Sequence, residues 1–421
     1  MKSLFAKKLS VTFLSSTVIL ISCDKSGSNP ESDDPGELKN ITTEVYQKEV
    51  IDSANRFAFN LFKPILAEAK ESENIMISPF SISSALSMTL NGAANETFEA
   101  IRKALRLEGK TIDQINSTYL KLMTDMVPVD KQVVMEIANS VWVEKKLVVK
   151  QPFISDLKKW YIAEARDIDA TDPKAVDIVN GWIAQKTHDK ITDMLDKLDP
   201  DLAMLLINAV YFNGKWRYQF DKKDSRNEAF YVNPSSPKTV PMMHQTENLK
   251  VIKKNSLTIA EIPYGQGNYT MVVVIPDENV TASEVAEELT PSIWKEWMDL
   301  LVVNTHKVEL TMPRFKYKYK RNLNDDLISL GMEIAFTGNA DFTKISDQGL
   351  MISRVLHQSF IETNEEGTEA AAATVVEIVL TSANPSSVVK VTLDHPFIYF
   401  IRESTTGTII FMGRVGDPAI D

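Results

Sequence analysis

Side chains able to carry out nucleophilic, acid–base or metal chemistry are few and scattered in this 421-residue chain. It has a single cysteine, Cys23, and five histidines, at positions 188, 244, 306, 357 and 395. The sequence contains no His-Glu-x-x-His pair or other close ligand set, so a zinc site is not indicated. It also lacks the Gly-x-Ser-x-Gly turn of serine hydrolases and a Gly-Lys-Ser/Thr phosphate loop. We therefore expect no catalytic residue, no metal and no cofactor.

The first 22 residues have the features of an export signal. A basic start is followed by an apolar run, Leu9 to Ile21, that is too short to span a bilayer comfortably. The run ends in Leu20-Ile21-Ser22-Cys23, which resembles the cleavage box of bacterial lipoproteins. In that case Cys23 would become the lipidated first residue, and the protein would be anchored at the cell envelope, facing periplasm or exterior. The alternative is a stray cysteine inside a cleaved signal peptide.

The remainder of the chain divides into a short tether and one large domain. Residues 23–44 comprise Cys23 and a segment that is polar, acidic and rich in Gly, Pro and Ser. This composition is typical of a flexible tether. Residues 45–421 show no second linker and no repeat, which predicts a single domain. With one cysteine, no disulfide can form within the chain. The net charge of −11 disfavours a nucleic-acid partner.

Helix patterns dominate the first third of this domain, and strand patterns dominate the rest. Val50, Ala54, Phe57 and Leu61 follow helical spacing, and Thr97 is a plausible N-cap of the next helix. Runs of β-branched and aromatic residues predict strands at 138–144, 205–212, 269–276 and 307–313, and a C-terminal hairpin of 397–402 with 408–415. Together they predict an α+β domain around a large, largely antiparallel sheet.

One stretch, residues 365–387, fits neither pattern as a whole. It begins with Glu and Ala, which favour helix, and continues with β-branched residues and a polar tail. Composition alone leaves a surface helix as likely as a strand. However, Ala370 to Ala373 offer no large apolar stripe, and Thr374 to Val379 alternate as strand residues do.

Four stretches in order resemble the serpins, the family of serine-protease inhibitors. They are 74–101 (NIMISPFSISSALSMTLNGAANETFEAI), 208–216 (NAVYFNGKW), 357–374 (HQSFIETNEEGTEAAAAT) and 395–415 (HPFIYFIRESTTGTIIFMGRV). The resemblance covers residues 45 to 417, and it implies a mixed helical domain with three β-sheets and an exposed reactive loop.

The resemblance also implies a mechanism. A target protease cleaves the loop, and the loop's N-terminal half inserts as a new strand into the main sheet, trapping the acylated protease. The expected function is irreversible inhibition by a monomer, with proteases as partners. The alternative from another class is a non-inhibitory binding protein with the same fold.

The loop residues fit such an insertion. Gly367 would be the flexible hinge, and the alternate residues Thr368, Ala370, Ala372 and Thr374 would face the core without carrying charge. In the family the cleaved bond usually lies 14 residues after this glycine, which gives Thr381–Ser382. Because the loop is a few residues longer than is common, Val379 or Leu380 are alternative cleavage sites. Thr381 suits elastase-like or subtilisin-like proteases, and Leu380 also suits papain-like cysteine proteases.

Matches to the family also assign supporting residues. A shutter cluster, where the sheet parts, is expected from Ser78, Ser81, Asn208 and His357, although each could simply be a satisfied core polar group. Trp216 matches the point where the loop first enters the sheet. Glu365 and Arg314 match an ion pair at the loop base, expected to be partly exposed and to contribute about 1 kcal/mol or less.

Overall fold

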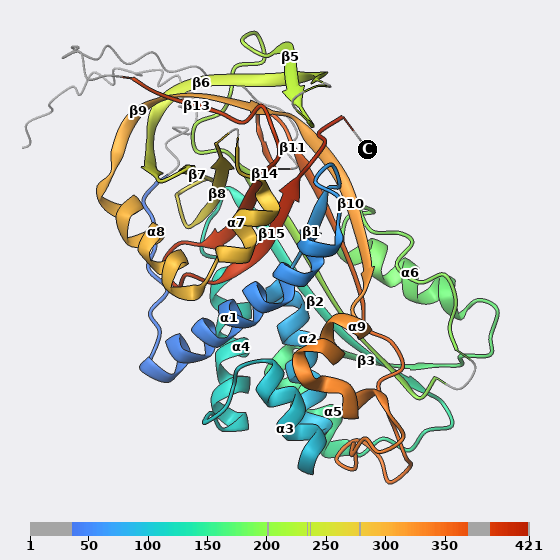
Figure 1. Cartoon of the computed structure of the whole chain (residues 1–421). Helices are drawn as coiled ribbons and strands as arrows, with labels where there is room; N and C mark the ends of the chain where they lie inside the picture. Colours follow the sequence, from blue (N-terminus) through green and yellow to red (C-terminus); the bar gives the residue numbers. More distant parts are fainter. Residues whose placement is uncertain are drawn as a thin grey trace, which may run out of the picture. The chain divides into compact units, whose positions relative to one another are not determined.

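The structure is a computed structural model that describes residues 36–419, apart from 200–201, 234, 236, 278 and 369–387. Most helices lie in the first half of the chain, as the sequence predicts (Figure 1). They are α1 (Val45–Glu68), α2 (Pro79–Gly92), α3 (Asn95–Ala104), α4 (Ile112–Met126), α5 (Gln151–Tyr161), α6 (Ala175–Lys186), α7 (Ala282–Glu288), α8 (Pro291–Val303) and α9 (Asn324–Leu327). No helix in the described ranges combines the length and the apolar character needed to cross a bilayer.

The predicted apolar face of α1 is buried, but the predicted start of α3 is wrong. Val50, Phe57 and Leu61 of α1 are at most 1% exposed. Helix α3 begins at Asn95, two residues before the expected N-cap. The Thr97 hydroxyl is not free to cap the helix, because it accepts a hydrogen bond from the Asp341 backbone NH (2.8 Å).

The strands form two hydrogen-bonded sheets in the described part of the chain. The larger has the order β1-β15-β14-β8-β7-β6-β9-β13, with β5 also paired to β6, and the smaller has the order β10-β11-β12-β4-β2-β3. The larger sheet consists of β1 (Ile75–Ile77), β5 (Arg226–Tyr231), β6 (Pro237–Lys254), β7 (Leu257–Pro263), β8 (Tyr269–Pro276), β9 (Thr305–Pro313), β13 (Val389–Thr392), β14 (Phe397–Glu403) and β15 (Ile409–Val415). The smaller consists of β2 (Val133–Glu144), β3 (Glu164–Ile168), β4 (Met204–Lys215), β10 (Phe315–Asn322), β11 (Leu356–Thr363) and β12 (Gly367–Thr368).

The larger sheet joins two of the three expected sheets through one strand. Residues 237–242 of β6 pair with β5, residues 242–250 pair with β9, and residues 250–254 pair with β7. Because β6 has 18 residues, it is long enough to belong to both groups and makes them continuous. Two pairings, β2 with β3 and β9 with β13, are parallel, and the others are antiparallel.

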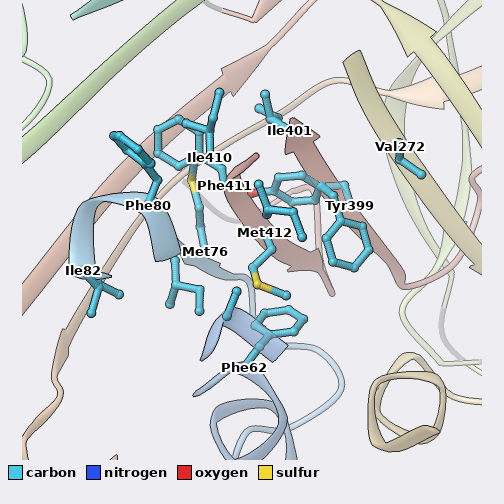
Figure 2. Packing of buried hydrophobic residues seen from close by; sticks show 14 of the residues in the cluster. Phe62, Met76, Phe80, Ile82, Val272, Tyr399, Ile401, Ile410, Phe411 and Met412 are labelled. Atoms are coloured by element: carbon cyan, nitrogen blue, oxygen red, sulfur yellow. The ribbon is translucent and has the colours of Figure 1, made fainter. Parts of the chain in front are cut away.

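The main core lies between the C-terminal hairpin and the first helices (Figure 2). Phe62 of α1 lies close to Met412 of β15, and Phe80 of α2 lies beside Ile410 and Phe411. All five side chains are at most 3% exposed. Full burial of a side chain of this size contributes about 1.5–3 kcal/mol. This packing fixes α2 against the inner face of the smaller sheet, where the candidate site lies.

Candidate functional site

The smaller sheet already contains the first residues of the candidate loop. Gly367 and Thr368 form β12 between β4 and β11, with Thr368 opposite Gly214 on one side and Thr363 on the other. Thr368 is 3% exposed. The hinge is therefore part of the sheet in the uncleaved protein, and the described part of the chain stops at Thr368, the second residue of β12.

Gly367 occupies a position where no side chain fits. Its φ is +156°, and a Cβ built there would lie 2.1 Å from the Gly214 carbonyl oxygen and 2.7 Å from Lys215 Cα. Both contacts are with backbone, which cannot move aside as a flexible side chain would. The glycine at the expected hinge is thus required by close approach to β4 as well as by its backbone freedom.

Two aromatic rings hold the hinge at the loop base. Trp216 stacks on Tyr264 with ring centroids 4.4 Å apart. The Trp216 backbone NH donates to the Glu366 carbonyl (2.9 Å), and its indole NH donates to the Asn364 carbonyl (2.9 Å). The Tyr264 hydroxyl lies 2.7 Å from Thr368 Oγ1, and burial raises its pKa, so it stays neutral. The expected entry residue, Trp216, thus contacts the hinge directly.

The expected ion pair at the loop base is present and partly exposed, with Arg314 reaching the surface and Glu365 buried. Arg314 Nε donates to Glu365 Oε1 (2.8 Å), and Ser225 Oγ donates to the same oxygen (2.5 Å). Glu365 is 1% exposed. Burial opposes ionisation, but the hydrogen bonds from Arg314 and Ser225 outweigh it and hold the Glu365 pKa below its ordinary value. Removal of Arg314 would leave a buried carboxylate without its counter-ion, so the pair matters more than a surface pair.

Sequence reasoning did not find a second buried carboxylate beside the first. Glu366 is 6% exposed, and it accepts a hydrogen bond from Lys222 Nζ (2.5 Å). Lys222 and Ser225 lie on the segment between β4 and β5, where the sequence shows no recognisable spacing to the loop. Only the folded chain brings them to the hinge.

The four expected shutter residues lie together under the middle of the smaller sheet. The Ser78 backbone NH donates to His357 Nε2 (3.2 Å), and Ser81 Oγ donates to the Asn208 carbonyl (3.3 Å). Asn208 Nδ2 donates to Asn139 Oδ1, which adds a residue that the sequence did not indicate. Burial lowers the His357 pKa to about 4, so the ring is neutral near pH 7 and accepts the hydrogen bond.

A gap separates β4 from β11 beyond the hinge. In the described residues these two strands are connected only through β12, although β4 has 12 residues and β11 has eight. A cavity of about 630 Å³ lies at the end of the gap farthest from the hinge. Its wall includes Met204 and Leu206 of β4, Leu86 of α2, Leu356 of β11 and the shutter residues Ser81, Asn208 and His357. Beyond β12, β4 and β11 are therefore not paired with each other in the described residues, and the cavity adjoins the end of this gap farthest from the hinge.

The remaining expected site residues lie outside the residues that the structure describes. They are Cys23, Ala370, Ala372, Thr374, Val379, Leu380, Thr381 and Ser382. Elsewhere in the chain, the described His, Cys, Asp and Glu residues form no group of three or more that could hold a metal ion.

Comparisons with known proteins agree with this geometry. A family model described as "Serpin (serine protease inhibitor)" matches residues 52–418. A serpin-like protein of Methanosarcina acetivorans, described as uncharacterized, is 34% identical over 389 residues, which cover 89% of each chain. The leukocyte elastase inhibitor of Sus scrofa is 34% identical over 387 residues, covering 88% of this chain and 100% of its own. Human thyroxine-binding globulin, crystallised with thyroxine, has a TM-score of 0.81 at 26% identity, covering 89% of this chain and 100% of its own.

Proposed function

This chain belongs to the serpin family, and from that premise we propose that it is an irreversible suicide-substrate inhibitor of serine proteases. The observation that carries the proposal is β12. Its two residues already pair with β4 and β11, and both strands continue beyond it with no strand between them in the described residues. A cut in the loop would free the following residues to continue β12 along this gap.

The register of β12 predicts where each loop residue would go. With Thr368 opposite Gly214 and Thr363, continued antiparallel pairing places Thr374 between Asn208 and His357. Asn208 Oδ1 is buried and has no hydrogen-bond partner among the residues that the structure describes. The Thr374 hydroxyl could donate to it, which would complete the shutter cluster.

The same register continues into the cavity. Val376 and Ile378 would lie opposite Leu206 and Met204, which line it. Val376 and Ile378 would thus meet apolar side chains of the cavity wall, and the small residues Ala370 and Ala372 precede them along the strand. The extrapolated register at Thr374, Val376 and Ile378 therefore supports our proposal that insertion is the trapping step.

The proposed bait is the Thr381–Ser382 bond, with Val379 and Leu380 as alternatives. A serine protease would attack the Thr381 carbonyl carbon, and the amine of Ser382 would leave. The protease would then remain esterified to the loop while residues 369–381 insert after Thr368. The small Thr381 favours elastase-like and subtilisin-like enzymes, and Leu380 extends the range to papain-like cysteine proteases. We further propose that Cys23 is lipidated and anchors the protein at a bacterial cell envelope.

The test is incubation with pancreatic elastase or subtilisin, followed by boiling in SDS. The expected result is a complex of inhibitor and protease that survives denaturation. The C-terminal peptide released by cleavage should have the mass of a fragment that starts at Ser382. Matched variants with proline at position 381 or 382 should resist cleavage at this bond. Complete cleavage across a broad protease panel, with no stable complex, would refute trapping.

A non-inhibitory binding role is the second candidate, because a hormone-binding protein is among the similar structures. Thermal unfolding of intact and loop-cleaved protein separates the two roles. An inhibitor should gain tens of degrees in Tm on cleavage, because the inserted strand adds a row of backbone hydrogen bonds. A binding protein that does not insert its loop should show little change.

A further inference from the structure

The segment just before α1 is attached to the body, although its composition predicts a flexible tether up to residue 44. Asn268 is fully buried, and its side-chain amide makes two hydrogen bonds with Lys39, accepting from its NH (3.0 Å) and donating to its carbonyl (2.6 Å). The Ile41 NH donates to Thr405 Oγ1 (3.1 Å), and Ile41 is 8% exposed. We call residues 36–41 the strap.

The strap begins beside the hinge. Gly36 lies against the side chain of Gln266, and the Gly36 carbonyl is 3.4 Å from Arg217 Nη1. Arg217 follows Trp216, and Gln266 lies two residues after Tyr264, the ring that stacks on Trp216. The strap therefore starts at the end of the smaller sheet that carries the hinge, which we call the loop end.

Helix α1, in contrast, begins farther from the loop end (Figure 1). Tyr46 OH lies 3.5 Å from Ser117 Oγ in α4. Helix α4 ends at Met126, whose carbonyl accepts a hydrogen bond from Tyr269 (2.7 Å), next to the strap's partner Asn268. Ser117 precedes Met126 by nine residues, or about 13 Å of helix. An undocked strap would thus let the N-terminal chain leave from the side of the body.

We propose that the docked strap makes the N-terminal tether leave the body at the loop end. A protein anchored through Cys23 then presents its bait loop to the bilayer and traps proteases held at that same surface. This inference rests on the proposed inhibitory function and anchor. Residues 24–35 are the only chain between Cys23 and the strap. Twelve residues span about 40 Å when fully extended and about 20 Å on average. In all but its most extended conformations, such a tether keeps the loop end nearer the bilayer than the far end of the sheet.

Fluorescence transfer to the membrane tests the orientation without natural lipidation. Because Cys23 is the only cysteine, a chain starting there can be coupled through its thiol to vesicles with maleimide headgroups. A donor dye is placed, through a non-canonical amino acid, at Lys223 at the loop end or at Val148 beyond the far end of β2. Both positions are open to solvent, since the Lys223 side chain is 88% exposed and Val148 is 76% exposed. The distance from Val133 to Val143 along β2 is about 33 Å. Transfer to an acceptor lipid should be at least twofold greater from Lys223, and equal or reversed transfer overturns the proposal.

Two changes test the strap itself. Ile41→Ser with Asn268→Ala should abolish the difference between the two dyes, whereas Asn227→Ala, at an exposed position on β5, should preserve it. A 40-residue Gly/Ser insertion between Pro35 and Gly36 leaves the body unchanged and should also reduce the difference. If both changes leave the difference intact, the strap does not set the orientation.

Inhibition kinetics test the partner. The uncoupled protein is first assayed in solution against subtilisin, so that a failure of inhibition itself is seen separately. Polyhistidine-tagged subtilisin is then bound to the same vesicles through nickel-chelating lipid. The coupled protein should inhibit it at least tenfold faster than it inhibits free subtilisin, because the shared surface raises the effective concentration. The double variant should lose most of this gain, and no gain with the unaltered strap contradicts the proposal.

Discussion

Thr368→Glu should convert the inhibitor into a substrate. In the uncleaved protein Thr368 is 3% exposed, and its hydroxyl faces Tyr264 OH at 2.7 Å and Thr363 Oγ1 at 3.3 Å. No cation is paired with this position in the described residues. A glutamate here would leave β12 and reach solvent, and it would have to be buried again when the cleaved loop inserts.

The cost follows from the pKa of a carboxyl group. Near pH 8, protonating a glutamate of ordinary pKa costs about 5 kcal/mol, which sets an upper limit on the penalty of burying it. Because the hinge inserts first, we take about half of this burial penalty to add to the activation free energy of loop insertion. A barrier raised by about 2.5 kcal/mol slows insertion by nearly 10²-fold. Hydrolysis of the acyl-enzyme would then outrun trapping.

The assay is a titration of subtilisin with inhibitor, which gives the number of inhibitor molecules consumed per protease inactivated. The ratio should rise from near one to above ten for Thr368→Glu. The control exchanges the two neighbours, Thr368→Glu with Glu369→Thr, which keeps composition and charge but moves the carboxylate to the inner face. Glu369→Thr alone should inhibit normally. An unchanged ratio for Thr368→Glu and the exchange variant would refute insertion from this hinge.

Three further predictions concern residues around the gap. Arg314→Ala should lower the free energy of unfolding, measured in urea, by about 2 kcal/mol, because Glu365 loses its counter-ion. This value lies between those of exposed and buried ion pairs, since Arg314 itself is partly exposed. No loss of stability would contradict a structural role for the pair. The His357 pKa falls from 6.5 to about 4 on folding, so its contribution of about 3 kcal/mol is complete above pH 6.5 and is lost as the pH falls toward 4; His357→Gln should flatten this part of the stability–pH curve. Thr374→Val should lower the stability of the cleaved protein by about 1–3 kcal/mol and leave that of the intact protein unchanged, since in the proposed register Thr374 supplies the partner that Asn208 Oδ1 lacks among the described residues. Equal effects on both forms would argue against the register.

The sequence predicts the strands better than the starts of the helices. Tyr269–Pro276 has the predicted bounds, because continuous β-branched residues leave little choice of structure. The start of α3 is not predictable from local residues, since Thr97 is engaged by Asp341, 244 positions away. Composition likewise predicts a flexible tether up to residue 44, because it cannot show that the buried Asn268 side chain binds the backbone of Lys39.

The candidate site divides in the same way. Family motifs locate Trp216, Glu365 and the shutter residues, because these lie in recognisable stretches. They do not locate Lys222, Ser225 or Tyr264, which reach the hinge from segments with no distinctive local pattern. Burial is also invisible in the sequence, which predicts a partly exposed pair but not that Glu365 is its buried member and Arg314 its exposed one.

The central claim is that the cleaved loop becomes a strand between β4 and β11. Hydrogen exchange of the backbone amides at 205–213 and 356–361, measured before and after loop cleavage, tests it most directly. On cleavage, amides facing the gap should become strongly protected, because they gain carbonyl partners from residues 369–378. Unchanged exchange at both strands in fully cleaved protein would contradict it.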